Sequence, residues 1–327
     1  MEAILKRGLS MTIKLGVVMD PIQSIKVKHD STFAMLLEAQ QRGWSIFYIE
    51  QKDLFLQDGV ARAQMRPLQV QDDVAKWFEL GEQENQPLQE LDVILMRKDP
   101  PVDASYIYTT QILELAEKAG VLVTNKPQSL RDFNEKLFIS WFPQCCAPTL
   151  VTCSAQQMKE FIQEHKEVIV KPLHGMGGVS IFRLKEGDAN INVVIELLTK
   201  NGKQLLQVQR YIPEIKDGDK RILLIDGKPV AKALARLATG DEFRANMAVG
   251  GRGIGAELSK RDYWICEQIG PLLKKNGLLF AGIDVIGDYL TEINITSPTC
   301  IRELDAIFSL NISAQLLDCI ETKLTNK

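Results

Sequence analysis

The chain has 327 residues, 45% of them hydrophobic and 25% charged, and its formal net charge is −3 at pH 7. This composition is ordinary for a globular enzyme of two or three domains, and the absence of any block of like charge argues against a partner such as nucleic acid or an anionic membrane surface. No run of 18 apolar residues occurs, so the sequence predicts no membrane-spanning helix.

The first part of the chain alternates predicted strands with predicted helices. Residues 1–10 carry neither a long apolar run nor a cleavage site, so we interpret them as a short N-terminal extension. Ser31 is the expected N-cap of a first helix, and Gly43 is expected to end it. Alternating strands and helices predict a parallel α/β domain over 11–133. The expected strands are 13–19, 46–49, 91–96 and 121–123, and the expected helices are 33–42 and 107–119.

After about residue 125 the pattern changes to hairpins. Asp226-Gly227 suits a type I′ turn between two strands. Residues 238–257 are rich in Gly and Arg and poor in apolar residues, which predicts a long mobile loop. Within it, 250–256 formally reads G-x-G-x-x-A, but no strand precedes it, so we do not expect a dinucleotide site. The expected strands are 168–171, 179–184, 220–225, 228–236, 279–286 and 289–295, and the expected helices are 265–275 and 311–324.

A glycine-rich loop separates the two strands predicted at 168–171 and 179–184. Gly175, Gly177 and Gly178 would let backbone N–H groups approach an anion, and Lys171 ends the preceding strand. The loop is not a P-loop, because GxxxxGK[ST] is absent. A tight turn that needs positive φ explains the glycines equally well. Both interpretations remain open from these residues alone.

Acidic and amide side chains mark the last predicted hairpin. Glu292 and Asn294 are two residues apart and therefore face the same side of a strand. With a three-residue loop at 287–289, Asp284 would stand opposite Glu292 on that side, whereas a two-residue loop would separate them. Two carboxylates and an amide oxygen suit Mg²⁺ bound together with phosphates. The alternative is a solvated polar face, which the apolar run at 279–286 disfavours.

Arginines gather in sequence around the same region. Arg221, Arg236, Arg244 and Arg252 flank the 220–236 hairpin and the loop after it, and Arg97-Lys98 follows the strand at 91–96. The end of such a strand is where α/β sheets keep their binding crevice. Each arginine alone is commonly a solvated surface residue. Together with the acidic hairpin, they predict a site for an anionic substrate and a phosphate-bearing nucleotide.

The six cysteines form no CxxC pair, and the chain has three histidines. A zinc site is therefore not expected. So few cysteines in a chain of this length suit free thiols in a reducing cytoplasm.

The order of these features resembles an ATP-grasp ligase: Lys136 in a predicted helix, Lys171 at a strand end, a glycine loop, a hinge, then acidic and amide ligands. The stretches at 19–22 (MDPI), 91–101 (LDVILMRKDPP), 125–130 (NKPQSL), 216–221 (KDGDKR) and 290–303 (LTEINITSPTCIRE) resemble bacterial glutathione synthetases. The resemblance runs from about residue 11 to the C-terminus. It implies an ATP-grasp fold, with an ATP-grasp region over 134–327 made of a central lid subdomain at about 134–212 and a C-terminal subdomain at about 213–327.

The resemblance also implies roles for individual residues. Lys136, Lys171 and the loop glycines would contact ATP phosphates, and Asp219 would belong to the nucleotide site. Asp284, Glu292 and Asn294 would hold Mg²⁺ or Mn²⁺. The remaining assignments are an adenine hinge at Gln209, Arg210, Tyr211 and Ile212; substrate carboxylates or the transferring phosphate on Arg97, Arg221 and Arg236; a closing loop at 238–252 with Arg244; and a glycine site near Ser297 and Arg302. His174 and Arg210 depart from the residues expected in relatives.

The activity implied by the resemblance is ligation of γ-glutamylcysteine and glycine, with ATP as co-substrate, giving glutathione, ADP and phosphate. The family further implies a cytoplasmic homo-oligomer, a dimer or tetramer, that binds small molecules rather than nucleic acid or membrane. Two alternatives share the same nucleotide residues. One is another carboxylate–amine ligase that adds glutamate or makes a different dipeptide. The other is a nucleotide-binding regulatory module without turnover.

Overall fold

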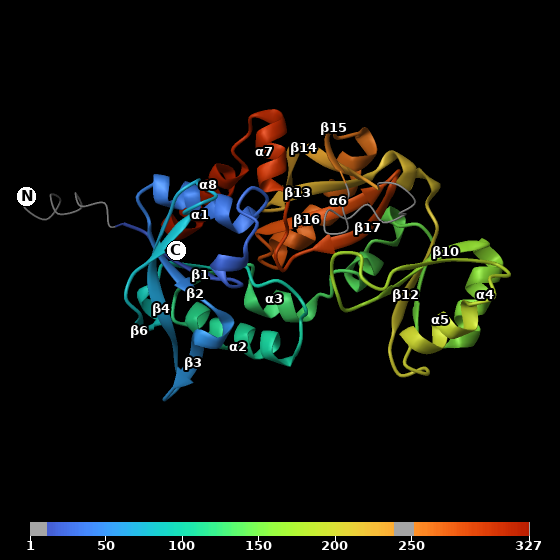
Figure 1. Ribbon diagram of the computed structural model, residues 1–327, viewed down its shortest axis with the longest axis horizontal. Coiled ribbons are helices and arrows are strands. Elements are labelled where there is room, and N and C mark those ends of the chain that lie inside the picture. Colours follow the sequence, from blue (N-terminus) through green and yellow to red (C-terminus); the bar gives the residue numbers. More distant parts are fainter. Residues whose placement is uncertain (1–11, 239–251, 327) are drawn as a thin grey trace, which may run out of the picture.

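The computed structural model describes residues 12–238 and 252–326. The described residues form three sheets that follow one another along the chain. Figure 1 shows them along the long axis, with the first sheet at one end, the third in the middle and the second at the other end. No helix in the described residues is both long and apolar enough to cross a membrane.

The first sheet is mixed rather than wholly parallel. Its order is β3-β4-β2-β1-β7-β8, with β5 and β6 also paired to β4. The pairs β1–β2, β1–β7 and β7–β8 are parallel, as predicted, but β4 runs antiparallel to β2. The antiparallel part was not expected. The strands of the first sheet are β1 (Lys14–Val18), β2 (Ser45–Ile49), β3 (Leu54–Gln57), β4 (Val60–Val70), β5 (Phe78–Leu80), β6 (Glu84–Pro87), β7 (Val93–Met96) and β8 (Leu122–Thr124).

Helices α1 (Ser31–Gln41), α2 (Ala104–Lys118) and α3 (Pro127–Asp132) belong to this part of the chain. The cap of α1 corrects the prediction, because Asp30 rather than Ser31 accepts the hydrogen bond from the amide of Phe33, at 2.7 Å. The hydroxyl of Ser31 instead accepts from the amide of Ile301 at 3.1 Å. A carboxylate at an N-cap satisfies an orphan helix donor and lies near the positive end of the helix dipole.

The second sheet is antiparallel throughout, in the order β11-β10-β12-β9. It packs its apolar face, including Val168, Val170 and Val208, against Met158 and Ile162 of the helix α4. Helices α4 and α5 lie on the outer side of this sheet (Figure 1). The strand predicted to start at 179 begins later, at Phe182. The elements are β9 (Thr149–Thr152), α4 (Ala155–His165), β10 (Glu167–Pro172), β11 (Phe182–Lys185), α5 (Ile191–Leu198) and β12 (Leu206–Arg210).

The third sheet has the order β15-β14-β13-β16-β17. The Asp226-Gly227 turn joins β13 to β14 with φ of 49° and 78°, as a type I′ turn requires. The strands and the helix that follows β15 are β13 (Asp219–Ile225), β14 (Lys228–Leu237), β15 (Arg252–Glu257), α6 (Lys260–Lys275), β16 (Phe280–Ile286) and β17 (Tyr289–Asn294).

Strand β15 corrects the loop predicted over 238–257, of which 239–251 lies outside the described residues. β15 pairs antiparallel with β14, so Ile254 lies opposite Ala235. Its glycines are needed for packing: a Cβ on Gly255 would lie 2.5 Å from the ring of Phe308. Because neighbouring side chains pack against bare backbone, the strand lacks the apolar alternation that would have revealed it.

The β16–β17 hairpin also differs from the prediction. Ile286 pairs with Tyr289, so the loop has two residues rather than three. The register then shifts between Asp284 and Val285: Val285 pairs with Leu290 and Asp284 with Glu292. Thr291 is therefore the extra residue of a β-bulge. The bulge places Asp284 and Glu292 on the same face of the hairpin. This arrangement was predicted, but from a three-residue loop rather than from a bulge.

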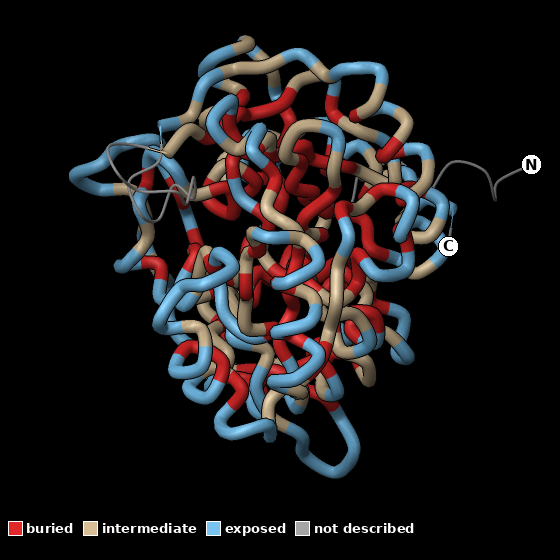
Figure 2. Tube along the Cα trace, turned by 90° about the vertical axis from the view of Figure 1, so that its right-hand side faces the viewer, coloured by how far each residue is buried: buried red, intermediate tan, exposed pale blue. Residues whose placement is uncertain are grey.

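The end of the chain returns to its beginning. Helices α7 (Ile301–Phe308) and α8 (Ile312–Thr325) follow the third sheet, and α8 lies beside α1 (Figure 1). Leu316 and Leu317 share a hydrophobic cluster with Phe33 and Leu36. Figure 2 shows buried segments in the middle of the molecule. Two hydrophobic clusters each contain buried residues from the first and the third sheet, so these two sheets share an apolar interior.

Candidate active site

A cleft of about 600 Å³ lies where the three sheets meet. Its walls come from the segments that follow β1 and β7, from the glycine loop after β10, from the face of the third sheet, and from 296–300 before α7. Of the residues predicted to act in the site, the cleft is lined by Arg97, Lys136, Gly175, Gly177, Gly178, Arg221, Arg236, Glu292, Asn294 and Ser297. Segments far apart in the sequence therefore converge on one space.

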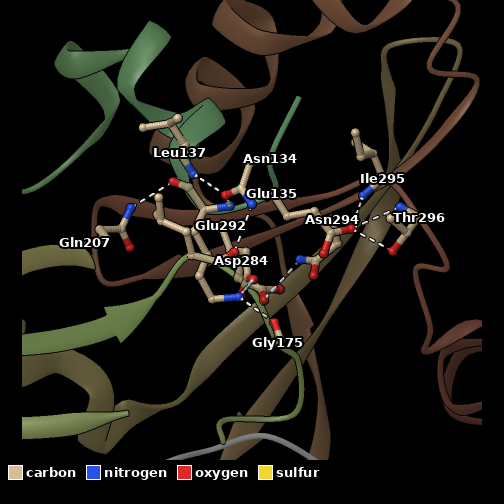
Figure 3. A network of polar contacts seen from close by, with 12 residues as sticks. Asn134, Glu135, Leu137, Gly175, Gln207, Asp284, Glu292, Asn294, Ile295 and Thr296 are labelled. Atoms are coloured by element: carbon tan, nitrogen blue, oxygen red, sulfur yellow. Dashed lines mark hydrogen bonds and ion pairs between the residues drawn. The ribbon is translucent and has the colours of Figure 1, made fainter. Parts of the chain in front are cut away.

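Lys136 is the N-cap residue of a short 3₁₀ helix, Leu137–Trp141, and not part of an α-helix as predicted. Its ammonium donates to Glu292 Oε1 at 2.8 Å and to the carbonyl of Gly175 at 2.9 Å. Figure 3 shows these acceptors in the network around the third sheet. Burial disfavours the charged form, but Glu292, together with Glu135 and Asp284, opposes it and raises the pKa of Lys136. The lysine is therefore a fixed cation that ties the glycine loop to β17.

Lys171 lies in β10, one residue before its end. Its ammonium has no hydrogen-bond or ion-pair partner among the described residues, in contrast to that of Lys136, and Lys171 does not line the cleft. Burial lowers the pKa of Lys171, and the nearby Glu292 partly opposes this effect. A desolvated ammonium without a direct partner is suited to an anionic ligand.

The glycine loop has the positive φ angles that the turn interpretation required, although the segment between β10 and β11 is longer than a tight turn. Gly175, Gly177 and Gly178 have φ of 114°, 66° and 80°, a region that side chains other than glycine rarely adopt. The carbonyl of Gly175 is held by Lys136. The turn requirement thus explains why these residues are glycines, and the phosphate role stays a prediction.

A buried network of two aspartates and two arginines backs the cleft. Asp284 is 2% exposed and accepts from Arg221 Nε at 2.5 Å, from Arg221 Nη2 at 3.0 Å and from Arg236 Nη2 at 3.0 Å. Burial alone would raise the pKa of Asp284, but the two guanidinium groups hold it well below its usual range. The two guanidinium groups therefore favour the ionised form of Asp284.

Asp219 belongs to the same network. Its Oδ2 accepts from Arg236 Nη2 at 2.6 Å, while its buried Oδ1 has no hydrogen-bond partner in the described part of the chain. Burial raises the pKa of Asp219 to about 6, although Arg236 acts in the opposite direction. An unpaired buried oxygen costs free energy unless a ligand or water completes it. Since Arg236 Nη2 contacts both Asp219 and Asp284, this arginine bridges the two carboxylates.

The three predicted metal ligands lie on one hairpin, but only Glu292 and Asn294 line the cleft, and both oxygens of Asp284 are held by arginines. Asp284 and Glu292 are paired across the hairpin, and Asn294 Nδ2 donates to Gly282 O and to Asp284 Oδ2. The amide oxygen of Asn294 is therefore the atom left for a cation. In residues 12–238 and 252–326, no group of three His, Cys, Asp or Glu side chains is arranged to hold a metal. A site here would take two carboxylates and an amide, with the remaining oxygens from phosphates, as Mg²⁺ sites do.

Glu135 is a cleft residue that the sequence reasoning missed. Its Oε1 accepts from the amide of Ile295 at 2.8 Å, and from the amide and hydroxyl of Thr296 at 3.0 and 2.9 Å (Figure 3). Burial raises the pKa of this carboxyl. Its only signal in the sequence is its position beside Lys136. Glu135 holds the end of β17 in place, and so orients the residues that follow it.

Four predicted hinge residues lie at or just after the end of β12, away from the lining of the cleft. Gln209 is buried and donates to Thr149 Oγ1 at 3.0 Å. The guanidinium of Arg210 lies 5.4 Å from the ring centre of Tyr289, and that of Arg183 lies 4.0 Å from Tyr211. Ile212 is buried. Their contact with adenine stays a prediction.

Arg302, which the resemblance placed near the glycine site, does not join the cleft. Arg302 pairs with Asp72 at 2.9 Å and does not line the cleft, although Ser297 does. Arg244 lies outside the described residues. The expected role of Arg302 near glycine therefore has no support from its contacts.

The chain matches two family profiles. Residues 13–131 match the prokaryotic glutathione synthetase N-terminal domain, and residues 135–309 match the prokaryotic glutathione synthetase ATP-grasp domain. Together these matches cover most of the chain. They also bracket the segments that supply the walls of the cleft.

Full-length relatives agree with the profiles. The glutathione synthetase of Pseudomonas putida is 59% identical over 314 residues, covering 96% of this chain and 99% of the relative. That of Escherichia coli is 55% identical over 312 residues, covering 95% and 99%. Among solved structures, D-cycloserine synthetase DcsG superposes with a TM-score of 0.67 over 95% of this chain and 99% of that one, at 13% identity, which supports the fold alone. The chain therefore belongs to the prokaryotic glutathione synthetase family and has the ATP-grasp fold.

Proposed function

We propose that this protein is an ATP-dependent ligase that joins γ-glutamylcysteine and glycine into glutathione. The observation that carries the proposal is the 55–59% identity to glutathione synthetases over nearly the whole length of both chains. The cleft is consistent with this activity, because it brings cations from three parts of the chain together with a carboxylate–amide donor set.

Lys136, Lys171 and the glycine loop would hold the ATP phosphates. The ammonium of Lys171 has no partner among the described residues, so a phosphate that bound it would displace no ion pair. Lys136 is paired with Glu292 and with Gly175, so phosphate binding there would compete with an existing ion pair. Asp219 and 209–212 complete the proposed nucleotide site, with the last segment against adenine.

Asp284, Glu292 and Asn294 would hold a divalent cation, for which we propose Mg²⁺, with Mn²⁺ as the substitute. When bound, such a cation neutralises charge on the phosphate oxygens. Arg221 and Arg236 keep Asp284 ionised and fixed. They also place two guanidinium groups beside the transferring phosphate, where preorganised donors stabilise charge that develops in the transition state.

The proposed reaction has two chemical steps. An oxygen of the cysteinyl carboxylate attacks the γ-phosphorus, the bond to the bridging oxygen breaks, and ADP leaves with an acyl phosphate formed. The deprotonated amine of glycine then attacks the acyl carbon, and inorganic phosphate leaves as the amide forms. The protein supplies position and charge, so none of the six cysteines is required as a nucleophile. Enclosure of the site would protect the acyl phosphate from water.

The test is ADP release from ATP and Mg²⁺ with γ-glutamylcysteine and glycine, omitting each component in turn. ADP that requires all four supports the proposed function. ADP with another acid or amine, but not with this pair, would replace the substrates and keep the ligase chemistry. Nucleotide binding without amine-dependent ADP release would favour a regulatory module.

We further propose a cytoplasmic homo-oligomer, a dimer or tetramer, that acts on small molecules. Analytical ultracentrifugation of the purified chain tests the oligomeric state, with a monomer at micromolar concentration as the contrary result. Fractionation of the producing cell tests the compartment.

A further inference from the structure

The carboxylate of Glu292 is paired with a cation of the chain itself. Its Oε1 accepts a hydrogen bond from the ammonium of Lys136 at 2.8 Å, and both residues line the cleft. The side chain of Lys136 is 8% exposed and that of Glu292 is 19% exposed, so water screens the pair weakly. Glu292 is also one of the residues to which the proposed function assigns a divalent cation. That cation and the ammonium would therefore meet at one carboxylate.

The two carboxylates of the β16–β17 hairpin differ in what a cation would have to displace. Both oxygens of Asp284 accept from arginines, Oδ1 from Arg221 and Oδ2 from Arg221 and Arg236. The pair that Glu292 forms is with a single lysine. A divalent cation on Glu292 would repel the ammonium of Lys136, and weak screening by water makes this repulsion strong. Lys136 is therefore the group that we expect to move when the cation binds.

The same ammonium holds the beginning of the glycine loop. Lys136 Nζ also donates to the carbonyl of Gly175 at 2.9 Å, and Figure 3 shows Gly175 and Glu292 in one network. Two residues earlier along the chain, Asn134 Nδ2 donates to the carbonyl of Leu173 at 2.8 Å. The side chain of Met176, which follows Gly175, is exposed and does not anchor the loop. Because one nitrogen atom contacts both Glu292 and Gly175, an ammonium that leaves Glu292 also leaves its present position at Gly175.

We propose that Lys136 links the cation site to the glycine loop: a divalent cation that binds Glu292 displaces the ammonium and thereby frees the carbonyl of Gly175. The inference rests on the proposed function, from which it takes the cation site, and adds a coupling between that site and the loop. The displaced ammonium keeps its charge beside the loop, where a phosphate can become its partner. Binding of the cation would thus prepare both the lysine and the loop for the nucleotide.

The backbone of Lys136 is held independently of its ammonium. Gln207 Nε2 donates to the carbonyl of Lys136 at 2.8 Å, and the amide of Lys136 donates to Asn134 Oδ1 at 3.1 Å. Replacement of the side chain should therefore leave the chain folded at this point. Lys136→Met keeps the length of the side chain and removes only its charge and donors, so it tests the link between cation and loop.

The first measurement is amide hydrogen exchange of residues 173–181, read by mass spectrometry without nucleotide, with and without Mg²⁺. In the wild type, Mg²⁺ should speed exchange in the loop by roughly 10-fold, the scale of one hydrogen bond from a charged donor. In Lys136→Met the exchange should be fast already and indifferent to Mg²⁺. Lys203→Met, which changes an exposed lysine outside the cleft, should respond as the wild type does. A lysine that only tied the loop down would give no dependence on Mg²⁺.

The second measurement is binding of Mn²⁺ without nucleotide, followed by electron paramagnetic resonance. Lys136→Met should bind Mn²⁺ roughly 10-fold more tightly than the wild type, because no ammonium competes for Glu292. Mn²⁺ that binds Lys136→Met but not the wild type would support the same competition. Glu292→Gln should weaken binding, and the exchange of its loop should not respond to Mg²⁺. Lys203→Met should bind Mn²⁺ like the wild type.

Three results would overturn the link. They are loop exchange that ignores the cation in a wild type that binds it, an equal response to Mg²⁺ in Lys136→Met, and Mn²⁺ binding that neither Lys136→Met nor Glu292→Gln alters. None of these measurements requires turnover. A wild type that releases ADP only with all four components, and whose loop ignores the cation, would keep the proposed function without the link. A wild type that releases no ADP would overturn the proposed function, while exchange and Mn²⁺ binding would still decide the link.

Discussion

Asp284 pairs with Glu292 across the β16–β17 hairpin, while the next residue, Val285, pairs with Leu290. The extra residue, Thr291, donates its hydroxyl to the carbonyl of Asp284 at 3.1 Å. Side chains alternate along a strand, so without this bulge the two-residue loop would place the carboxylates on opposite faces. The bulge thus creates the donor set on which the proposed metal site depends.

The first prediction concerns that donor set. Glu292→Gln should raise the Mg²⁺ concentration needed for half-maximal rate, by about 10-fold or more, because a neutral amide replaces one of two carboxylate ligands. An Mg²⁺ titration of ADP release measures the effect. Glu82→Gln, an exposed change outside the cleft, should titrate like the wild type. Identical titrations for the two variants would count against the metal assignment.

The second prediction concerns Lys171. Lys171→Ala should fold and lower turnover by roughly 100-fold or more, since a preorganised charge in a water-poor site is worth on the order of 3 kcal/mol in the transition state. Steady-state ADP release measures the loss of turnover, and a circular dichroism melt shows whether the variant folds. Lys203→Ala removes an exposed lysine from the turn before β12 and should change neither. Unchanged turnover in Lys171→Ala would remove this lysine from the mechanism.

The third prediction concerns the joint between the first and third sheets. Asn125 is 5% exposed; its Nδ2 donates to Phe280 O at 2.7 Å and Ile295 O at 2.6 Å, and its Oδ1 accepts from Phe280 N at 2.9 Å. Asn125→Ala would leave these buried backbone groups unpaired and should cost about 3 kcal/mol.

The midpoint of urea unfolding measures this loss. Asn190→Ala is the control, because Asn190 is exposed and caps α5 without a side-chain hydrogen bond. Equal midpoints for the two variants would show that the Asn125 contacts do not hold the sheets together.

The fourth prediction is a pH dependence at Asp305. This carboxyl lies in the last turn of α7 and accepts from the amide of Ile312 at 3.0 Å, and burial raises its pKa to about 6. Its ionised form is therefore disfavoured in the folded state, a cost that is present above pH 6 and vanishes as pH falls toward the unfolded pKa near 4.

Asp305→Asn keeps the acceptor without the charge. It should melt at a higher temperature than the wild type at pH 7, with a gain that solvent screening limits to about 1 kcal/mol, and the two melts should converge toward pH 4. Melts at several pH values measure this. If the melting temperature of Asp305→Asn exceeded that of the wild type by more at pH 4 than at pH 7, burial would not be raising the pKa of Asp305. Asp58→Asn, at an exposed turn, is the control variant and should melt close to the wild type at pH 7.

Several features followed from the sequence because they depend on local chemistry. Asp-Gly at 226–227 accepts positive φ and forms the expected turn, and the apolar run predicted as a strand at 91–96 contains the fully buried parallel strand β7 at 93–96. The order of Lys136, Lys171, the glycine loop and the acidic hairpin led to the ATP-grasp family, which the comparisons confirm. The spacing of these residues and their order along the chain can be read from the sequence alone, because neither depends on contacts between distant parts of the chain.

Only the tertiary structure decided what depends on partners far along the chain. Strand β15 has no alternation to reveal it, because its glycines admit side chains from elsewhere. Arg302 forms an ion pair with Asp72. The side chains of Glu135 and Asn125 hydrogen-bond to backbone groups more than 150 positions away in the sequence. The register of the β16–β17 hairpin depends on a bulge at Thr291, which the residues of the turn do not predict. In each case, the free energy of burying and pairing polar groups in the assembled core, rather than local propensity, determines the outcome.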